Sequence, residues 1–178
     1  MVAINRNPPT SNQLQPTKFQ VLFPRVTTVT YFCQRANIPS LEADPIIQGT
    51  PFVDLPRPRD KVTYGSFDLE FILDEELWGW QIIHDWIRGY TFPCSFDEYK
   101  NMYRESITTL KSSTPQYSDA YLQVLSAVNV PKFKIKFVNV FPVYLSEIDF
   151  DTTRDANLAM TAKVQFRYHL YNIERMIN

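Results

Sequence analysis

The spacing of apolar residues changes within one stretch of the chain, residues 66–89 (SFDLEFILDEELWGWQIIHDWIRG). Its first part alternates apolar with polar positions, which is the pattern of a half-buried β-strand. From Leu77 the apolar residues recur every three or four positions, which predicts an amphipathic helix over about residues 75–88. Asp74 is placed to cap this helix, and Gly89 is placed to end it. The sequence therefore predicts a strand that runs directly into a helix.

The predicted helix carries all three tryptophans of the chain, Trp78, Trp80 and Trp86. Trp80 belongs to one helical stripe, and the other two belong to the stripe beside it. Aromatic side chains on adjacent stripes give the helix a wide apolar face that another element has to cover. We therefore expect the three tryptophans to anchor the helix to a β-sheet.

Two strands are predicted ahead of this unit. Residues 18–23 (KFQVLF) alternate, and residues 26–35 (VTTVTYFCQR) are rich in β-branched and aromatic side chains. The short link between them favours an antiparallel hairpin. The next segment, residues 36–61, holds five prolines and one glycine and is too long for an ordinary connection. We expect a long extended loop there, with a small hairpin that projects from the body.

The C-terminal half is predicted to contain mostly strands. A capping-box spacing favours a short helix within residues 95–110, and an apolar run predicts a strand over residues 120–127. Residues 132–150 alternate as a strand that Pro142 interrupts. Residues 157–171 alternate over an unusual length, so this last strand is expected to bend or to cross from one sheet to another.

The predicted fold is mainly β: an antiparallel sandwich or barrel with one flanking helix (about residues 75–88) and a long extended loop (about residues 37–61). Residues 1–17 are polar and contain prolines, which predicts a flexible N-terminal arm. Residues 18–178 are expected to form a single β-barrel domain.

Composition narrows the functional classes. The 18 basic and 19 acidic side chains leave a formal net charge of −1, so generic nucleic-acid binding lacks its usual electrostatic support. No run approaches the ~20 apolar residues that span a bilayer. Cys33 and Cys94 are the only cysteines, and their apolar neighbours predict buried free thiols.

No pattern indicates catalysis. His84 and His169 are the only histidines, and no zinc-ligand spacing includes them. The carboxylate clusters are explained by helix capping or by a solvated ridge, and no nucleophile elbow, Walker loop or dinucleotide fingerprint occurs. We therefore expect a non-enzymatic protein with no catalytic, cofactor-binding or metal-binding residues and no cofactor.

Three lysines alternate with apolar residues in one predicted strand, at Lys132, Lys134 and Lys136. They form a basic sheet face, which is explained either by ordinary solvation or by pairing with an acidic strip on a neighbouring subunit. Residues 147–151 (EIDFD) are an example of such a strip. The sequence leaves both explanations open.

Several segments, in this order, resemble the tail tube proteins of contractile-tailed bacteriophages, a superfamily that includes type VI secretion tube rings. They are KFQVLFP, YFCQRANIPSLE, LPRPRDKVTYGSFDLEFILDEELWGWQIIHDWI, FPVYLSEIDFD and AMTAKVQFRYHLY. Together they cover most of residues 18–171. The central motif is the strand, acidic pair and tryptophan-bearing helix of residues 67–86.

The resemblance implies a structural virion protein, a β-barrel-like subunit of hexameric rings that stack into a tube inside a contractile sheath and conduct the genome. Implied partners are other copies of the chain, the tail sheath protein, and baseplate and tape-measure proteins, with DNA only in transit. Such proteins assemble in the host cytoplasm and end in the virion tail. Residues 1–17 and 90–118 are longer than a minimal tube subunit needs, so a tube-initiator, baseplate or tail-terminator ring of the same fold is the alternative.

The resemblance also assigns two surfaces. The extended loop would lap onto a neighbouring subunit or ring through Ile46, Ile47, Phe52, Val53, Leu55, Arg57 and Arg59. DNA in transit should slide past a polar wall. The candidate lumen face is therefore the polar row of the last strand, Thr161, Lys163, Gln165 and Arg167.

Overall fold

The computed structural model describes residues 13–105, 108, 114–153, 155 and 158–176. Most of the predicted N-terminal arm, residues 1–12, lies outside the described residues. The helices are α1 (Thr27–Phe32), α2 (Trp78–Thr91) and α3 (Phe96–Glu105). The strands are β1 (Phe19–Leu22), β2 (Cys33–Ala36), β3 (Leu41–Glu42), β4 (Ile46–Gly49), β5 (Asp54–Arg57), β6 (Thr63–Tyr64), β7 (Phe67–Ile72), β8 (Ser118–Leu125), β9 (Pro131–Leu145), β10 (Thr161–Arg167) and β11 (Leu170–Arg175).

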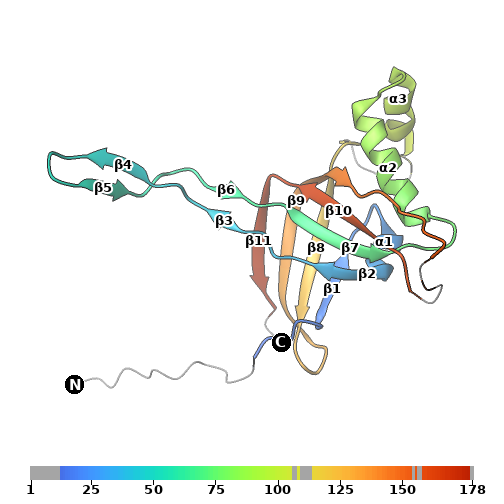
Figure 1. Ribbon diagram of the computed structural model, residues 1–178, viewed down its shortest axis with the longest axis horizontal. Helices are drawn as coiled ribbons and strands as arrows, with labels where there is room; N and C mark the ends of the chain where they lie inside the picture. Colours follow the sequence, from blue (N-terminus) through green and yellow to red (C-terminus); the bar gives the residue numbers. More distant parts are fainter. Residues whose placement is uncertain (1–12, 106–107, 109–113, 154, 156–157, 177–178) are drawn as a thin grey trace.

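The body is built around β9, a strand of 15 residues (Figure 1). The first half of β9 pairs with β8 and β11, and its last residues pair with β10. The strand order β1-β8-β9-β10-β7-β2 is antiparallel throughout. The mainly β, antiparallel prediction is confirmed. The barrel is not, because β1 and β2 end this order and do not pair with each other in the described part of the chain.

The strand predicted over residues 26–35 is wrong in its first part, where α1 forms. Val26 and Val29 are both buried, one helical turn apart, and the Phe23 N–H donates to the Thr30 hydroxyl (2.9 Å). These contacts override the β-propensity of the valines and threonines. As a result β1 and β2 form no hairpin: β1 pairs with β8, and β2 pairs with β7.

The strand predicted over residues 157–171 passes from one group of paired strands to another, as its length predicted. β10 pairs with β7 and the end of β9, and after Tyr168 and His169 the chain continues as β11 beside the start of β9. The expected interruption at Pro142 is wrong. This proline lies inside β9 opposite Phe166, next to the bulged residue Val143, because Gln165 and Phe166 of β10 pair with Tyr144 and Pro142. The ladder is irregular at a bulge, so a residue without an N–H is tolerated beside it.

Helix α2 differs from its prediction at both ends. Leu77 has a φ of 55°, so the helix begins at Trp78, and the Asp74 carboxylate accepts the N–H groups of Trp78 (3.0 Å) and Gly79 (3.3 Å). Gly89 does not end the helix, which runs to Thr91. A Cβ on Gly89 would lie 2.8 Å from the sulfur of Met102, so the glycine instead allows α3 to pack closely.

The tryptophans of α2 have different environments. Trp86 is 2% exposed, packs edge-on to Phe23 (6.0 Å) and donates its indole N–H to the Gln116 carbonyl (3.1 Å). Trp80 is half-buried and donates to the Ser146 carbonyl (3.2 Å). Trp78 is 55% exposed and donates to Glu76, so its expected role as an anchor is wrong. It is the first residue of the helix.

Helix α1 was not predicted, whereas α3 forms within residues 95–110, where the capping-box spacing predicted a short helix. α3 packs on α2, and Met102 is its buried residue. Elsewhere on α3, Phe96 is 70% exposed and Tyr103 is 42% exposed. Residues 106–107 and 109–110 of the predicted helix lie outside the described residues.

Candidate assembly surfaces

A long two-stranded arm projects from the body between β2 and β7 (Figure 1). β4 and β5 pair antiparallel with Ile47 opposite Pro56, and β3 pairs with β6 nearer the body. The tip is closed by Thr50, whose hydroxyl accepts the Val53 N–H (3.2 Å). The sequence predicted this projecting hairpin. We call residues 38–62 the arm.

The arm exposes its apolar side chains. Phe52 at the tip is 98% exposed and Ile47 is 67% exposed. Six further residues expose between 43% and 59% of their surface: Ile38, Leu41, Ile46, Val53, Leu55 and Val62. Arg57, the last residue of β5, and Arg59, between β5 and β6, are exposed as well. A solvated two-stranded hairpin is marginally stable, and contiguous apolar surface marks an interaction site. The arm is therefore the strongest candidate interface, and its assembly role stays a prediction.

The base of the arm is held firmly to the body. Tyr64 packs against Tyr168 (5.8 Å) and Tyr171 (5.4 Å), which belong to the corner between β10 and β11. On the other side of the arm, the Asn37 amide donates to the Ser66 carbonyl (3.0 Å) and accepts the Asp68 N–H (2.7 Å). These contacts fix the direction in which the arm leaves the body.

Tyr168 has an unusual place in this cluster. It is 9% exposed, and its hydroxyl has no hydrogen-bond partner among the described residues. Burial, with smaller effects from Tyr171 and Tyr64, raises the pKa of Tyr168 to about 12. The phenol is therefore neutral at physiological pH.

The candidate lumen residues share the outer face of β10, beside β7. Lys163 stands opposite Glu70, and Gln165 stands opposite Asp68. The Gln165 amide donates to Asp68 (3.1 Å), and the Thr161 hydroxyl donates to Glu70 (3.1 Å). Arg167 donates to the Tyr64 carbonyl (3.3 Å). Lys163 is thus faced by a carboxylate, which the sequence alone did not show. The face is polar and of mixed charge, and its place in a lumen stays a prediction.

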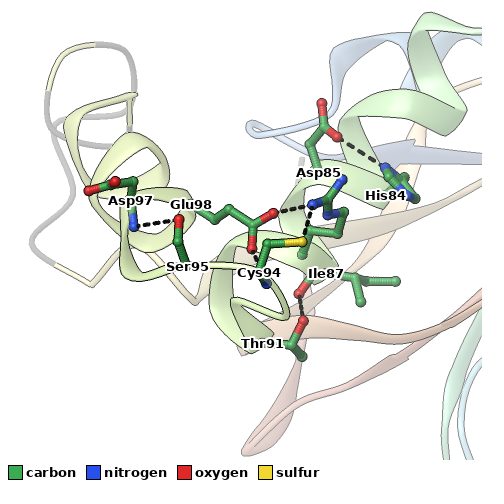
Figure 2. A network of polar contacts seen from close by, with 9 residues as sticks. His84, Asp85, Ile87, Thr91, Cys94, Ser95, Asp97 and Glu98 are labelled. Carbon is green, nitrogen blue, oxygen red and sulfur yellow. Dashed lines mark hydrogen bonds and ion pairs between the residues drawn. The ribbon is translucent and has the colours of Figure 1, made fainter.

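A polar network joins α2 to α3 (Figure 2). Arg88 pairs with Glu98, which also accepts the Cys94 N–H (3.3 Å). The Ser95 hydroxyl accepts the Asp97 N–H (3.3 Å), so the predicted cap at this helix start is present.

Cys94 is exposed, contrary to the buried thiol predicted. The turn from α2 to α3 carries it outward. Cys33 is half-buried, and burial raises the pKa of its thiol to about 11.

The histidines contact neighbours within the fold. His84 stacks on Trp80 (5.2 Å) and lies 3.0 Å from the Asp85 carboxylate. His169 contacts the Asn139 amide (3.0 Å). In the described part of the chain, no three histidine, cysteine, aspartate or glutamate side chains are grouped to hold a metal ion. Within those same residues, no helix has the length and apolar character to cross a membrane.

Comparisons with known proteins bear on the role of these surfaces. No protein-family model matches the chain. Over 170 residues the chain is 24% identical to the tail tube terminator protein of Enterobacteria phage T4, covering 92% of this chain and 90% of that protein. The expected resemblance to contractile tail tube proteins is confirmed.

Solved structures at low sequence identity share the fold of this chain. One is the tube-terminating cap of the anti-feeding prophage, with a TM-score of 0.61, 13% identity, and coverage of 99% of this chain and 100% of that chain. Another is a chain of the anti-feeding prophage baseplate, with a TM-score of 0.57, 15% identity, and coverage of 93% and 97%. The relatives support the terminator alternative better than the tube-subunit expectation.

Proposed function

We propose that this chain is a tail tube terminator, a structural protein that forms a ring on the end of a contractile tail tube opposite the baseplate. One observation carries the proposal: the sequence similarity to a tail tube terminator runs through 92% of the chain and 90% of that relative. The similar fold of a tube-terminating cap adds support. The repeating tube subunit, which the sequence first suggested, is the weaker assignment.

In this proposal the ring is a hexamer, and the arm is its main contact with a neighbouring subunit or with the last ring of the tube. The exposed apolar residues of the arm would be buried there, which would give the hairpin the packing it lacks in an isolated chain. The outer face of β10 would line the opening, with Lys163 opposite Glu70 of β7 and the polar Gln165 opposite Asp68. The sheath is a second partner, and DNA passes without being held. The proposal assigns no catalytic role to the chain.

Copy number tests the terminator role directly. A terminator ring contributes about as many copies per particle as one ring of the tube, whereas a tube subunit contributes as many copies as there are rings, multiplied by the ring size. Quantitative mass spectrometry of purified particles should find this chain at a small fraction of the main tube protein. An abundance equal to that of the most abundant tube component would reject the terminator role.

The second candidate is a ring at the baseplate end of the tube. It is favoured by the similar fold of a baseplate chain. Copy number does not separate it from a terminator, but particles made without the chain do. Loss of a terminator leaves baseplates with attached tubes. Loss of a baseplate ring should prevent tubes from starting.

A further inference from the structure

The start of β9 carries a basic surface. Lys132, Lys134 and Lys136 lie on the outer face of the sheet, because the intervening Ile135 and Phe137 are buried on its inner face. Lys18, just before β1, lies at the same end, since its carbonyl accepts the Leu125 N–H (2.9 Å) where β8 finishes. We call these four lysines (Lys18, Lys132, Lys134 and Lys136) the basic face.

The carboxylates on the basic face do not neutralise it. Asp119 pairs with Lys136 (3.2 Å), and this contact raises the pKa of Lys136. Glu174 stands opposite Lys134 in β11. The Lys134 ammonium group also lies over the Tyr121 ring, 4.4 Å from its centre. Four lysines against these two carboxylates leave the surface positive, and Lys132 is exposed.

Beyond the other end of β9 the chain is acidic. Glu147, Asp149 and Asp151 follow the strand and are exposed. The hydroxyl and N–H of Thr153 both donate to Asp151, and the hydroxyl bond is the larger cause of its lowered pKa. Asp151 therefore stays ionised at neutral pH.

A second acidic segment, the turn between β7 and α2, lies beside the first. The indole of Trp80 in α2 donates to the Ser146 carbonyl (3.2 Å), directly before Glu147. Glu75 and Glu76 in this turn are exposed. In Figure 1 the chain that leaves β9 runs beside the start of α2. We call Glu75, Glu76, Glu147, Asp149 and Asp151 the acidic end.

The basic face and the acidic end cannot meet within one chain. Lys136 and Glu147 are eleven residues apart along β9 and its end, which at about 3.3 Å each separates the two surfaces by up to roughly 36 Å. A contact between two different surfaces of identical subunits is head-to-tail, which is the arrangement that closes into a ring. We propose that the basic face of one copy docks on the acidic end of a second copy. Opposite charges at this contact would steer the subunits together and fix their register.

This inference deepens the proposed ring, because it names a contact through which the copies would associate. The formal net charge of the chain is only −1, so separation of charge between two ends, not excess charge, drives the association. Nucleic acid is disfavoured as the occupant of the basic face, because the carboxylates of Asp119 and Glu174 within it would repel phosphate.

Charge reversal on each surface tests the contact in the full chain. One variant carries Lys132→Glu and Lys134→Glu, and the other carries Glu75→Lys and Glu147→Lys. We expect each variant alone to need at least ~10-fold more protein than the wild type for half of the chains to assemble, as measured by sedimentation and mass photometry. An equimolar mixture of the two variants should recover assembly, because in a ring of alternating variants every face meets an end of opposite charge. A single chain with all four reversals has complementary surfaces again and should assemble as readily as the wild type.

The matched control reverses two exposed cations on α3, with Lys100→Glu and Arg104→Glu, and should assemble normally. Circular dichroism melting identifies any variant that fails through unfolding, and the four-reversal chain keeps the test decisive if one double variant is unstable.

The inference is overturned by assembly that is insensitive to all reversals, by failure of the four-reversal chain to recover although folded, or by a wild-type chain that stays monomeric. Binding of a short DNA duplex by the basic face at physiological salt would also overturn it. Normal assembly of the reversed variants would leave the terminator proposal intact, because that proposal is tested by copy number.

Discussion

The body and the arm contain the same kinds of residue in opposite environments. In the body Phe137 is 0% exposed and Ile135 is 1% exposed, whereas on the arm Phe52 is 98% exposed and Ile47 is 67% exposed. Both regions are antiparallel β-structure. The two regions differ in which elements pack against each strand. The body strands share a core with one another and with α2, while β4 and β5 have only each other.

This contrast separates stability from assembly. Burying an apolar side chain stabilises the fold by about 1.5–3 kcal/mol, so the body residues hold the isolated chain together. The exposed arm residues contribute little to that stability, and their apolar surface is available to a partner. Substitutions in the two regions should therefore have opposite effects on two measurements, the free energy of unfolding and the formation of rings.

Shortening the arm should give the largest effect on assembly. Deleting residues 44–59 and joining the ends with a short glycine linker keeps β3 and β6 but removes the exposed hairpin. We expect complete loss of ring formation, with a free energy of unfolding within about 0.5 kcal/mol of the wild type. Electron microscopy and urea unfolding measure the two quantities. Rings of normal appearance would show that the arm is not an interface.

Trp86→Ala should give the largest effect on stability. The Trp86 side chain on α2 packs against Phe23 and Phe166. Its removal should therefore cost about 3–5 kcal/mol in the free energy of unfolding. Phe52→Ala removes a side chain of the same class from the arm tip and should cost less than about 0.5 kcal/mol. Urea titration compares the two. Equal losses would mean that the arm packs against the body in solution.

Two glycines of α2, Gly79 and Gly89, test how closely this helix packs against its neighbours in the body. Gly89→Ala places a Cβ 2.8 Å from the Met102 sulfur and 2.9 Å from its Cβ, and this overpacking should cost about 1–3 kcal/mol. Gly79→Ala meets its nearest atom, on Phe71, at 3.4 Å, so the better helix propensity of alanine should offset the strain. Thermal melts of both variants measure the difference. If Gly89→Ala is as stable as the wild type, α3 is not packed on α2 as described.

The smallest expected effect concerns pH at the base of the arm. The folded chain raises the pKa of Tyr168 to about 12, above the value near 10 of an unfolded chain. The folded state therefore holds this proton more tightly, so its contribution is complete below pH 10 and is lost as pH rises toward 12. Tyr168→Phe removes this titration and the buried hydroxyl. Urea unfolding between pH 8 and 12 should show a shallower decline for the variant than for the wild type, and parallel declines would contradict the burial of this hydroxyl.

Local periodicity was sufficient for much of the fold. The alternation in β7, in the start of β9 and in β10 gave the correct inner faces, and the proline-rich composition of residues 36–61 gave the projecting hairpin. Long-range contacts decided what the sequence did not show. α1 is a helix because Val26 and Val29 enter the core together, and the strand order depends on pairings between residues about 100 positions apart.

The candidate surfaces were predicted to different degrees. Five of the eight exposed apolar arm residues were named from the sequence, because an apolar segment rich in prolines has few ways to be buried, whereas Ile38, Leu41 and Val62 were not. The carboxylate of Glu70 that faces Lys163 was missed, since only the pairing of β7 with β10 brings the two together. Trp78 was misassigned because a helical stripe does not reveal which of its members stays exposed.

The central claim is that this chain ends the tail tube, and its position on the particle tests that claim most directly. Cryo-electron microscopy of tails whose copies of this chain carry a fused tag at the C-terminus would show where the chain lies. The account predicts one ring of tag density at the end of the tube opposite the baseplate. Density repeated along the whole tube, or confined to the baseplate, would contradict it.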